Sequence, residues 1–151
     1  MNLEVLSTSE SMSLCRAAAG LVLGRFRLLA DQTETQDPKL NQLFTDLADE
    51  VERSLVEMDQ LDGQARLPEV LDEKTGQQVA RGFLPSLSKG HDGVRMGRES
   101  GFYLVECVLE DLARFYGVLA RQSSDEKSRE LLLRWKSAIG SRLLFLQHVV
   151  L

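Results

Sequence analysis

The sequence predicts an all-α fold in which four amphipathic helices form two antiparallel hairpins. Apolar residues recur at spacings of three and four along four long segments, the period of a helix with one buried face. Short polar turns separate the first segment from the second and the third from the fourth, whereas a long, glycine-rich stretch, residues 62–97, separates the two pairs. We therefore expect hairpins at 11–61 and 98–149, joined by a crossover that runs the length of the bundle.

The first hairpin is defined by a polar start and by a proline. The first helix is expected to begin after Ser9-Glu10-Ser11, where serine can cap it, and to end near Asp31. The second is expected to begin at Asp37-Pro38, because proline suits the first helical turn and an acidic residue favours a helix start. The predicted buried stripes are Leu14, Ala18, Leu21, Val22, Phe26 and Leu29, then Leu40, Leu43, Phe44, Leu47, Val51, Leu55 and Met58.

The second hairpin has the same pattern. Its first helix is expected to begin at Arg98 or Glu99 and to end at the polar run 123–126, and its second helix to begin near Glu126. The predicted buried residues are Phe102, Val105, Leu109, Leu112, Tyr116 and Leu119, then Leu131, Leu132, Trp135, Ile139, Leu143 and Leu146. Within the crossover, residues 68–73 are compatible with one short helix.

Composition restricts the class of protein. The chain has 151 residues, 43% hydrophobic and 27% charged, which fits a single globular domain spanning 1–151 and not a disordered chain. A net charge of −5 gives no basic field for nucleic acid. The longest wholly non-polar run, Ala17–Gly24, is too short to cross a bilayer, and no signal-peptide pattern opens the chain. We expect a cytoplasmic protein that binds neither nucleic acid nor membrane.

The charge is divided between the two halves of the chain. Residues 1–75 carry 7 basic and 15 acidic side chains, a net of −8, whereas residues 76–151 carry 11 and 8, a net of +3. The acidic excess lies mainly on the predicted outer face of the second helix, at Asp46, Asp49, Glu50, Glu52 and Glu57, which we expect to be solvated. The basic excess lies on the fourth helix. Attraction between the hairpins of one chain is the simplest account, and attraction across a dimer interface the alternative.

The two hairpins also align with each other. Arg25–Ala30 matches Phe115–Ala120, and Leu43–Leu47 matches Leu131–Trp135 after a two-residue gap. With its aromatic and Leu-Ala runs at Phe26–Ala30 and Tyr116–Ala120, the chain resembles the ferritin-like superfamily, especially rubrerythrin-like proteins, over nearly its whole length. The resemblance implies an up-down four-helix bundle with a long crossover between its second and third helices.

The resemblance also implies a di-iron site whose ligands are substituted here. In that superfamily each hairpin supplies an inward Glu from its first helix and a Glu-x-x-His from its second. Matched position by position, those six ligand sites fall at Ala19, Val51, Ser54, Leu109, Ile139 and Arg142. None of these side chains is an expected iron ligand. For Arg142 we expect exposure at the surface, or less readily an ion pair with Glu106.

Three functions remain open from the sequence. The first is a non-catalytic bundle with no catalytic residue and no cofactor, acting through self-association or an unidentified protein partner. The second is an iron-binding or redox protein with a displaced metal site at Glu50, Glu106 and Glu110. The third is a carrier of a small apolar ligand, which predicts a cavity lined by Ala19, Val51 and Leu109.

The remaining candidate features have plain structural interpretations. The first helix is apolar around most of its circumference, and Gly20, Leu23 and Gly24 suggest a homodimer interface there, with tight packing inside one chain as the alternative. Cys15 and Cys107 are expected to be small apolar residues of helices, and not a disulfide. The segment 88–95 is expected to be a surface loop and not a phosphate loop, while His148 near the carboxyl terminus predicts no site.

Overall fold

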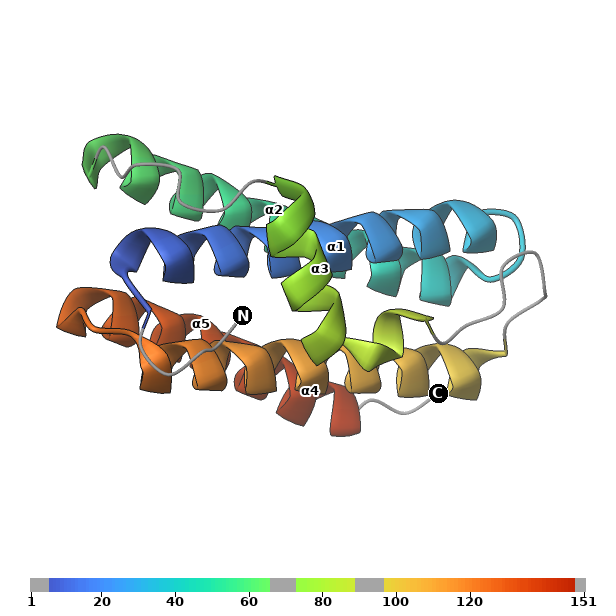
Figure 1. Ribbon diagram of the computed structural model, residues 1–151. Coiled ribbons are helices and arrows are strands. Elements are labelled where there is room, and N and C mark those ends of the chain that lie inside the picture. Colours follow the sequence, from blue (N-terminus) through green and yellow to red (C-terminus); the bar gives the residue numbers. More distant parts are fainter. Residues whose placement is uncertain (1–5, 66–72, 89–96, 149–151) are drawn as a thin grey trace.

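The computed structural model describes residues 6–65, 73–88 and 97–148, and for residues 61–65 it describes the backbone alone. Most of the segment 88–95 therefore lies outside the described residues. Apart from one isolated backbone bridge, the regular structure within these ranges is helical (Figure 1). The predicted all-α class is confirmed.

Four long helices form two antiparallel pairs, and a short helix crosses between them (Figure 1). α2 and α4 run in the same direction, so the chain returns along the length of the molecule between the end of one and the start of the other. In chain order the elements are α1 (Thr8–Thr33), α2 (Pro38–Ala65), α3 (Glu73–Phe83), the 3-10 helix η1 (Pro85–Ser88), α4 (Arg98–Gln122) and α5 (Glu126–Gln147).

The start of α1 differs from the sequence prediction. The helix begins at Thr8, three residues before the expected start, and Ser7 is its N-cap. The Ser7 hydroxyl accepts a hydrogen bond from the backbone N–H of Glu10 at 3.1 Å, and the Glu10 carboxylate accepts one from the Ser7 N–H at 3.1 Å. This capping box satisfies two backbone donors at once, which favours Ser7 over the later serines.

The expected starts of α2, α4 and α5 are confirmed. The Asp37 carboxylate accepts from the backbone N–H of Leu40 at 3.3 Å and from Arg98 Nε, at the start of α4, at 2.8 Å. The Arg98 hydrogen bond holds the pKa of Asp37 below its usual range. Asp125 caps α5 by accepting from the backbone N–H of Ser128 at 3.0 Å, and this bond lowers the Asp125 pKa. The two aspartates thus fix the starts of α2 and α5.

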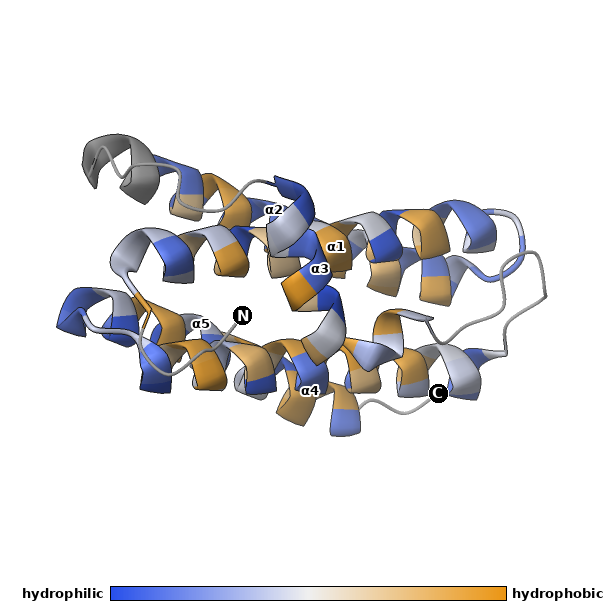
Figure 2. Ribbon diagram, in the orientation of Figure 1, coloured by the Kyte–Doolittle hydropathy of each residue, from blue (hydrophilic) through white to orange (hydrophobic). Residues whose placement is uncertain are grey.

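The core is formed by the predicted apolar stripes, all of whose residues are buried or half-buried. Phe26, Phe44 and Phe115 are the bulkiest of its fully buried side chains. Figure 2 shows apolar residues recurring along each long helix, with hydrophilic residues between them. α1 is the central helix, since it contacts α2, α3, α4 and α5. In the described parts of the chain, no helix combines the length and apolarity needed to cross a membrane.

The crossover contains one helix that the sequence did not predict. α3 spans Glu73–Phe83, whereas residues 68–72 of the expected short helix lie outside the described residues. α3 lies across α1 and α4 (Figure 1). Gly76 permits the close approach to α1, because a Cβ there would lie only 3.4 Å from the Ala17 Cβ. At the other end of α3, the Phe83 ring stacks on Phe115 of α4, with ring centroids 4.7 Å apart.

A buried carboxylate secures the end of the crossover to α4. Asp111, 5% exposed, accepts a hydrogen bond from the backbone N–H of Ser86 in η1 at 2.9 Å. Its second oxygen accepts from Arg114 Nη1 at 3.2 Å. The apolar periodicity of α4 does not predict a buried aspartate, so this anchor was missed in the sequence.

The amino-terminal segment joins the two hairpins at one end of the molecule. Leu6, 1% exposed, donates its N–H to the carbonyl of Gln122 at 2.7 Å and accepts from the N–H of Ser124 at 3.0 Å. The hydroxyls of Ser11 and Ser123 lie 2.9 Å apart and share a hydrogen bond. The α4–α5 turn is therefore held against the start of α1.

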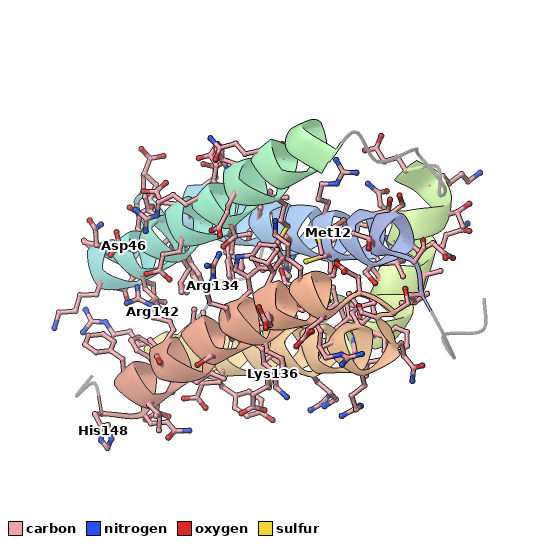
Figure 3. The ribbon with its side chains drawn as sticks, turned by 90° about the vertical axis from the view of Figure 1, so that its left-hand side faces the viewer. Met12, Asp46, Arg134, Lys136, Arg142 and His148 are labelled. Carbon is pink, nitrogen blue, oxygen red and sulfur yellow. The ribbon has the colours of Figure 1, made fainter. Side chains whose placement is uncertain are left out.

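The hairpins are closed along one side and open along the other. α3 covers the side where α1 contacts α4. On the opposite side α2 and α5 scarcely approach each other, and we call this region the α2–α5 seam. Figure 3 shows Arg134 and Arg142 of α5 on the side that faces α2.

Replacing Asp111 should weaken the attachment of the crossover to α4. We expect Asp111→Ala to lower the free energy of unfolding by about 1–3 kcal/mol, because the buried Ser86 N–H loses its acceptor. Hydrogen exchange of the Ser86 amide and of the α3 amides should become faster. Glu110→Ala, at the exposed neighbouring position, is the control and should change neither quantity. Equal losses in both variants would contradict this role for Asp111.

Candidate functional site

A cavity lies between α2, α4 and α5, beneath the α2–α5 seam. Its volume is about 90 Å³, and its lining is mostly apolar. Five of the six positions matched to iron ligands lie in its wall; only Ala19, which is fully buried, does not. The lining residues are Leu47, Glu50, Val51, Ser54, Leu109, Leu112, Tyr116, Trp135, Ala138, Ile139 and Arg142.

Outside the cavity a wider groove follows the seam. Its volume is about 710 Å³, and Glu50, Ser54, Trp135, Ala138 and Arg142 line both spaces. The groove adds the side chains of Arg53, Glu57, Arg134, Ser141 and Phe145. A small molecule could thus reach the centre of the protein through the seam.

Two ion pairs cross the seam and join the oppositely charged halves of the chain. Glu50 pairs with Arg142, at 3.4 Å between Oε1 and Nη2, and Glu57 pairs with Arg134. The side chains of Glu50 and Glu57 are 39% and 42% exposed, which agrees with the prediction of a solvated acidic face. The prediction missed that their side of α2 faces the basic residues of α5.

Arg142 also corrects a prediction. Its side chain is 24% exposed, so it is not a surface residue, and its ion-pair partner is Glu50 and not Glu106. Its guanidinium carbon lies 5.5 Å from the centre of the Phe145 ring, a distance at which a cation and an aromatic ring attract each other. The half-open seam is what permits a guanidinium this close to the core, since an isolated charge in a dry interior would be very costly.

Two nitrogen donors at the site have no acceptor. The Nε1 of Trp135 and the Nε of Arg142 are buried, and within the described residues neither is hydrogen-bonded. Trp135 itself is only 6% exposed. The prediction of Trp135 as a core aromatic is confirmed, but its place in the cavity wall was missed. The spacing of Trp135, Ala138 or Ile139, and Arg142 along one helix face could have indicated a shared lining.

On the α1 side of the cavity a chain of weak hydrogen bonds joins three helices. The Tyr116 hydroxyl is hydrogen-bonded to the sulfur of Cys15, and the Cys15 thiol donates to the sulfur of Met58 at 3.7 Å. Burial raises the pKa of both Cys15 and Tyr116. The Cys15 thiol therefore stays protonated at neutral pH, which suits a core residue and not a nucleophile. Cys107, the other cysteine, is half-buried, and neither forms a disulfide.

The displaced metal site is not assembled. In the described part of the chain, no three His, Cys, Asp or Glu side chains lie together in a way that could hold a metal ion. Glu50 lies at the seam, where it pairs with Arg142, while Glu106 and Glu110 are not in the wall of the cavity. The described residues therefore do not bring these three glutamates together as one group of ligands.

The suggested dimer residues lie on the outer side of α1. Gly20 and Gly24 are exposed, and a Cβ added at either would meet no atom within 4 Å. Leu23 is half-buried, and Leu28, one turn beyond Gly24, is 43% exposed. This face is uncovered by the described residues of the chain, which leaves it accessible to another molecule.

Comparisons with protein-family models, with curated proteins and with solved structures find no match to this chain.

Filling the cavity should stabilise the protein. We expect Val51→Ile to raise the free energy of unfolding by up to about 1 kcal/mol, because it adds one buried methylene to empty space. Chemical denaturation measures the change. Val56→Ile on the same helix, at a position 51% exposed, is the matched control and should have almost no effect. A loss of stability in Val51→Ile alone would show that the cavity has no room for the added group.

Proposed function

We propose that this chain is a non-catalytic binding protein whose central cavity holds a small, largely apolar ligand. The observation that carries the proposal is the cavity itself, which lies among the positions that the ferritin-like resemblance assigns to iron ligands. Residues of low polarity replace carboxylates and imidazoles there, notably Val51, Leu109 and Ile139. Such a lining is typical of small-molecule sites, which are concave and mostly apolar with a few polar groups.

The arrangement of the helices supports a ferritin-like origin of the site. Two antiparallel hairpins, a connection that returns the chain between α2 and α4, and the internal alignment of the hairpins are all features of that superfamily (Figure 1). In this proposal the chain keeps the bundle and its central site but has exchanged metal chemistry for ligand binding. The carrier hypothesis predicted Ala19, Val51 and Leu109 in the lining; Val51 and Leu109 are there and Ala19 is not.

Binding can be followed through the single tryptophan, which lies in the wall of the cavity. We expect benzene, 1-hexanol or hexanoate to change Trp135 fluorescence in a saturable way. Val51→Phe should weaken binding at least tenfold, because the larger ring occupies the ligand's space. Val56→Phe, on the exposed face of α2, should leave binding unchanged. Absence of saturable binding for all three probes would overturn the proposal.

Self-association is a second candidate function, and the uncovered face of α1 favours it. Glycines one turn apart let another helix approach closely, and here they lie beside the exposed Leu28. Neither the glycines nor Leu28 line the cavity or the groove, so a homodimer and a ligand site are compatible.

A charged substitution tests the dimer. If α1 is the interface, Gly24→Arg should convert a dimer to a monomer in sedimentation velocity at high micromolar concentration, without loss of helical signal, since the added side chain enters open space. Gly82→Arg, at another open and exposed glycine on α3, is the control and should stay dimeric. A monomeric parent protein would remove this second function.

A further inference from the structure

The unsatisfied polar atoms at the cavity are all of one kind. Trp135 Nε1–H and Arg142 Nε–H are donors that cannot accept, and burial without a partner costs each of them free energy. The nearby Ser54 hydroxyl is already used, since it donates to the carbonyl of Glu50 at 3.3 Å. The site therefore lacks a hydrogen-bond acceptor. A ligand that supplies an acceptor gains more binding free energy than a ligand that does not.

The charge of the residues around the seam also favours a ligand that is an acceptor, because it favours an anion. The walls of the cavity and groove contain three arginines, Arg53, Arg134 and Arg142, against two glutamates, Glu50 and Glu57, a local balance of +1 in a chain of net charge −5. Such a locally positive, partly desolvated site attracts an anion in preference to a neutral molecule or a cation.

Arg142 has bonding capacity left for such an anion. Its ion pair with Glu50 uses Nη2, and the distance of 3.4 Å is longer than the 2.7–2.9 Å typical of a strong charged hydrogen bond. Its Nε–H is unused within the described residues. A guanidinium presents donors in a fixed fork that matches a carboxylate, so a ligand carboxylate could share or displace Glu50.

Resting on the proposed function, we propose that the ligand is a small organic acid with an apolar body. Its carboxylate accepts hydrogen bonds from Trp135 Nε1–H and Arg142 Nε–H at the seam. Its hydrocarbon part enters the cavity among Val51, Leu109, Leu112 and Ile139. The carboxylate of the ligand competes with the Glu50 carboxylate for Arg142. Glu50 therefore weakens binding of the acid.

Isothermal titration calorimetry tests the class of ligand. The full chain is titrated with hexanoate, 1-hexanol and hexylamine, whose carbon chains have equal length. Hexanoate should bind at least tenfold more tightly than 1-hexanol or hexylamine at neutral pH, because a charged group that completes buried donors gains more than a neutral one. In the series from butanoate to octanoate, affinity should rise about fourfold per methylene until the cavity is full.

One ion pair at the seam, Glu50–Arg142, and one away from it, Arg27–Glu52, supply matched variants. Glu50→Gln should tighten hexanoate binding by about two- to fivefold, because it frees Arg142 from a weak competing pair. Arg142→Gln and Trp135→Phe should each weaken hexanoate binding about tenfold and 1-hexanol binding less, because a neutral hydroxyl is a weaker acceptor than a carboxylate. Glu52→Gln and Arg27→Gln, which break an exposed ion pair outside the walls of the cavity and groove, should stay within about twofold of the parent protein.

The outcomes separate the two proposals. Equal affinity for 1-hexanol and hexanoate, or weaker hexanoate binding in Glu50→Gln, would overturn the organic acid and leave the binding function standing. No binding of any of the probes by the folded parent protein would overturn both. Because Glu50 is half-buried and its replacement keeps the shape of the side chain, this variant remains informative if Trp135→Phe or Arg142→Gln fails to fold.

Discussion

The packing of α3 across α1 and α4 shapes the rest of the structure, because it closes one of the two long sides between the hairpins. Gly76 against Ala17 and Phe83 stacked on Phe115 bring the crossover into close contact with both hairpins, and Asp111 secures its end. Nothing comparable in the described residues covers α2 and α5. The hairpins are thus held together by packing on the α3 side and by the Leu6 bridge, whereas at the seam they are joined by ion pairs between side chains.

An open seam explains why charged side chains reach a cavity whose lining is otherwise mostly apolar. Where water has access, Arg142 can keep its charge beside Val51 and Leu109 while it pairs with Glu50 and lies against Phe145. In a closed bundle the same arginine would carry the full cost of desolvation. The apolar residues beside Arg142 and Trp135 thus form a mostly apolar cavity whose wall also contains these two polar side chains, which is an arrangement suited to binding a small molecule.

The features that could be predicted from sequence are those with local causes. Helical periodicity located the buried stripes, and Asp37-Pro38 and Asp125-Glu126 located two helix starts, since caps act within three or four residues. The capping box at Ser7 and Glu10 was equally local and could have been found. The place of α3, the anchor at Asp111 and the pairing of Leu6 with the α4–α5 turn could not, because each depends on partners far away in the chain.

The sequence by itself determined that the chain is all-helical, where three of its four long helices begin, which apolar residues they bury, and that none of the six positions matched to iron ligands carries an expected ligand. Only the tertiary structure decided that five of these positions line a cavity and that Glu50 and Glu57 face the arginines of α5. It also decided that Trp135 and Arg142 each have a buried N–H donor without an acceptor in the described residues. Periodicity defines one face of a helix relative to its own axis. The angle and distance at which two such faces meet are set by the packing of all the helices together, and the cavity exists only as the space that this packing leaves.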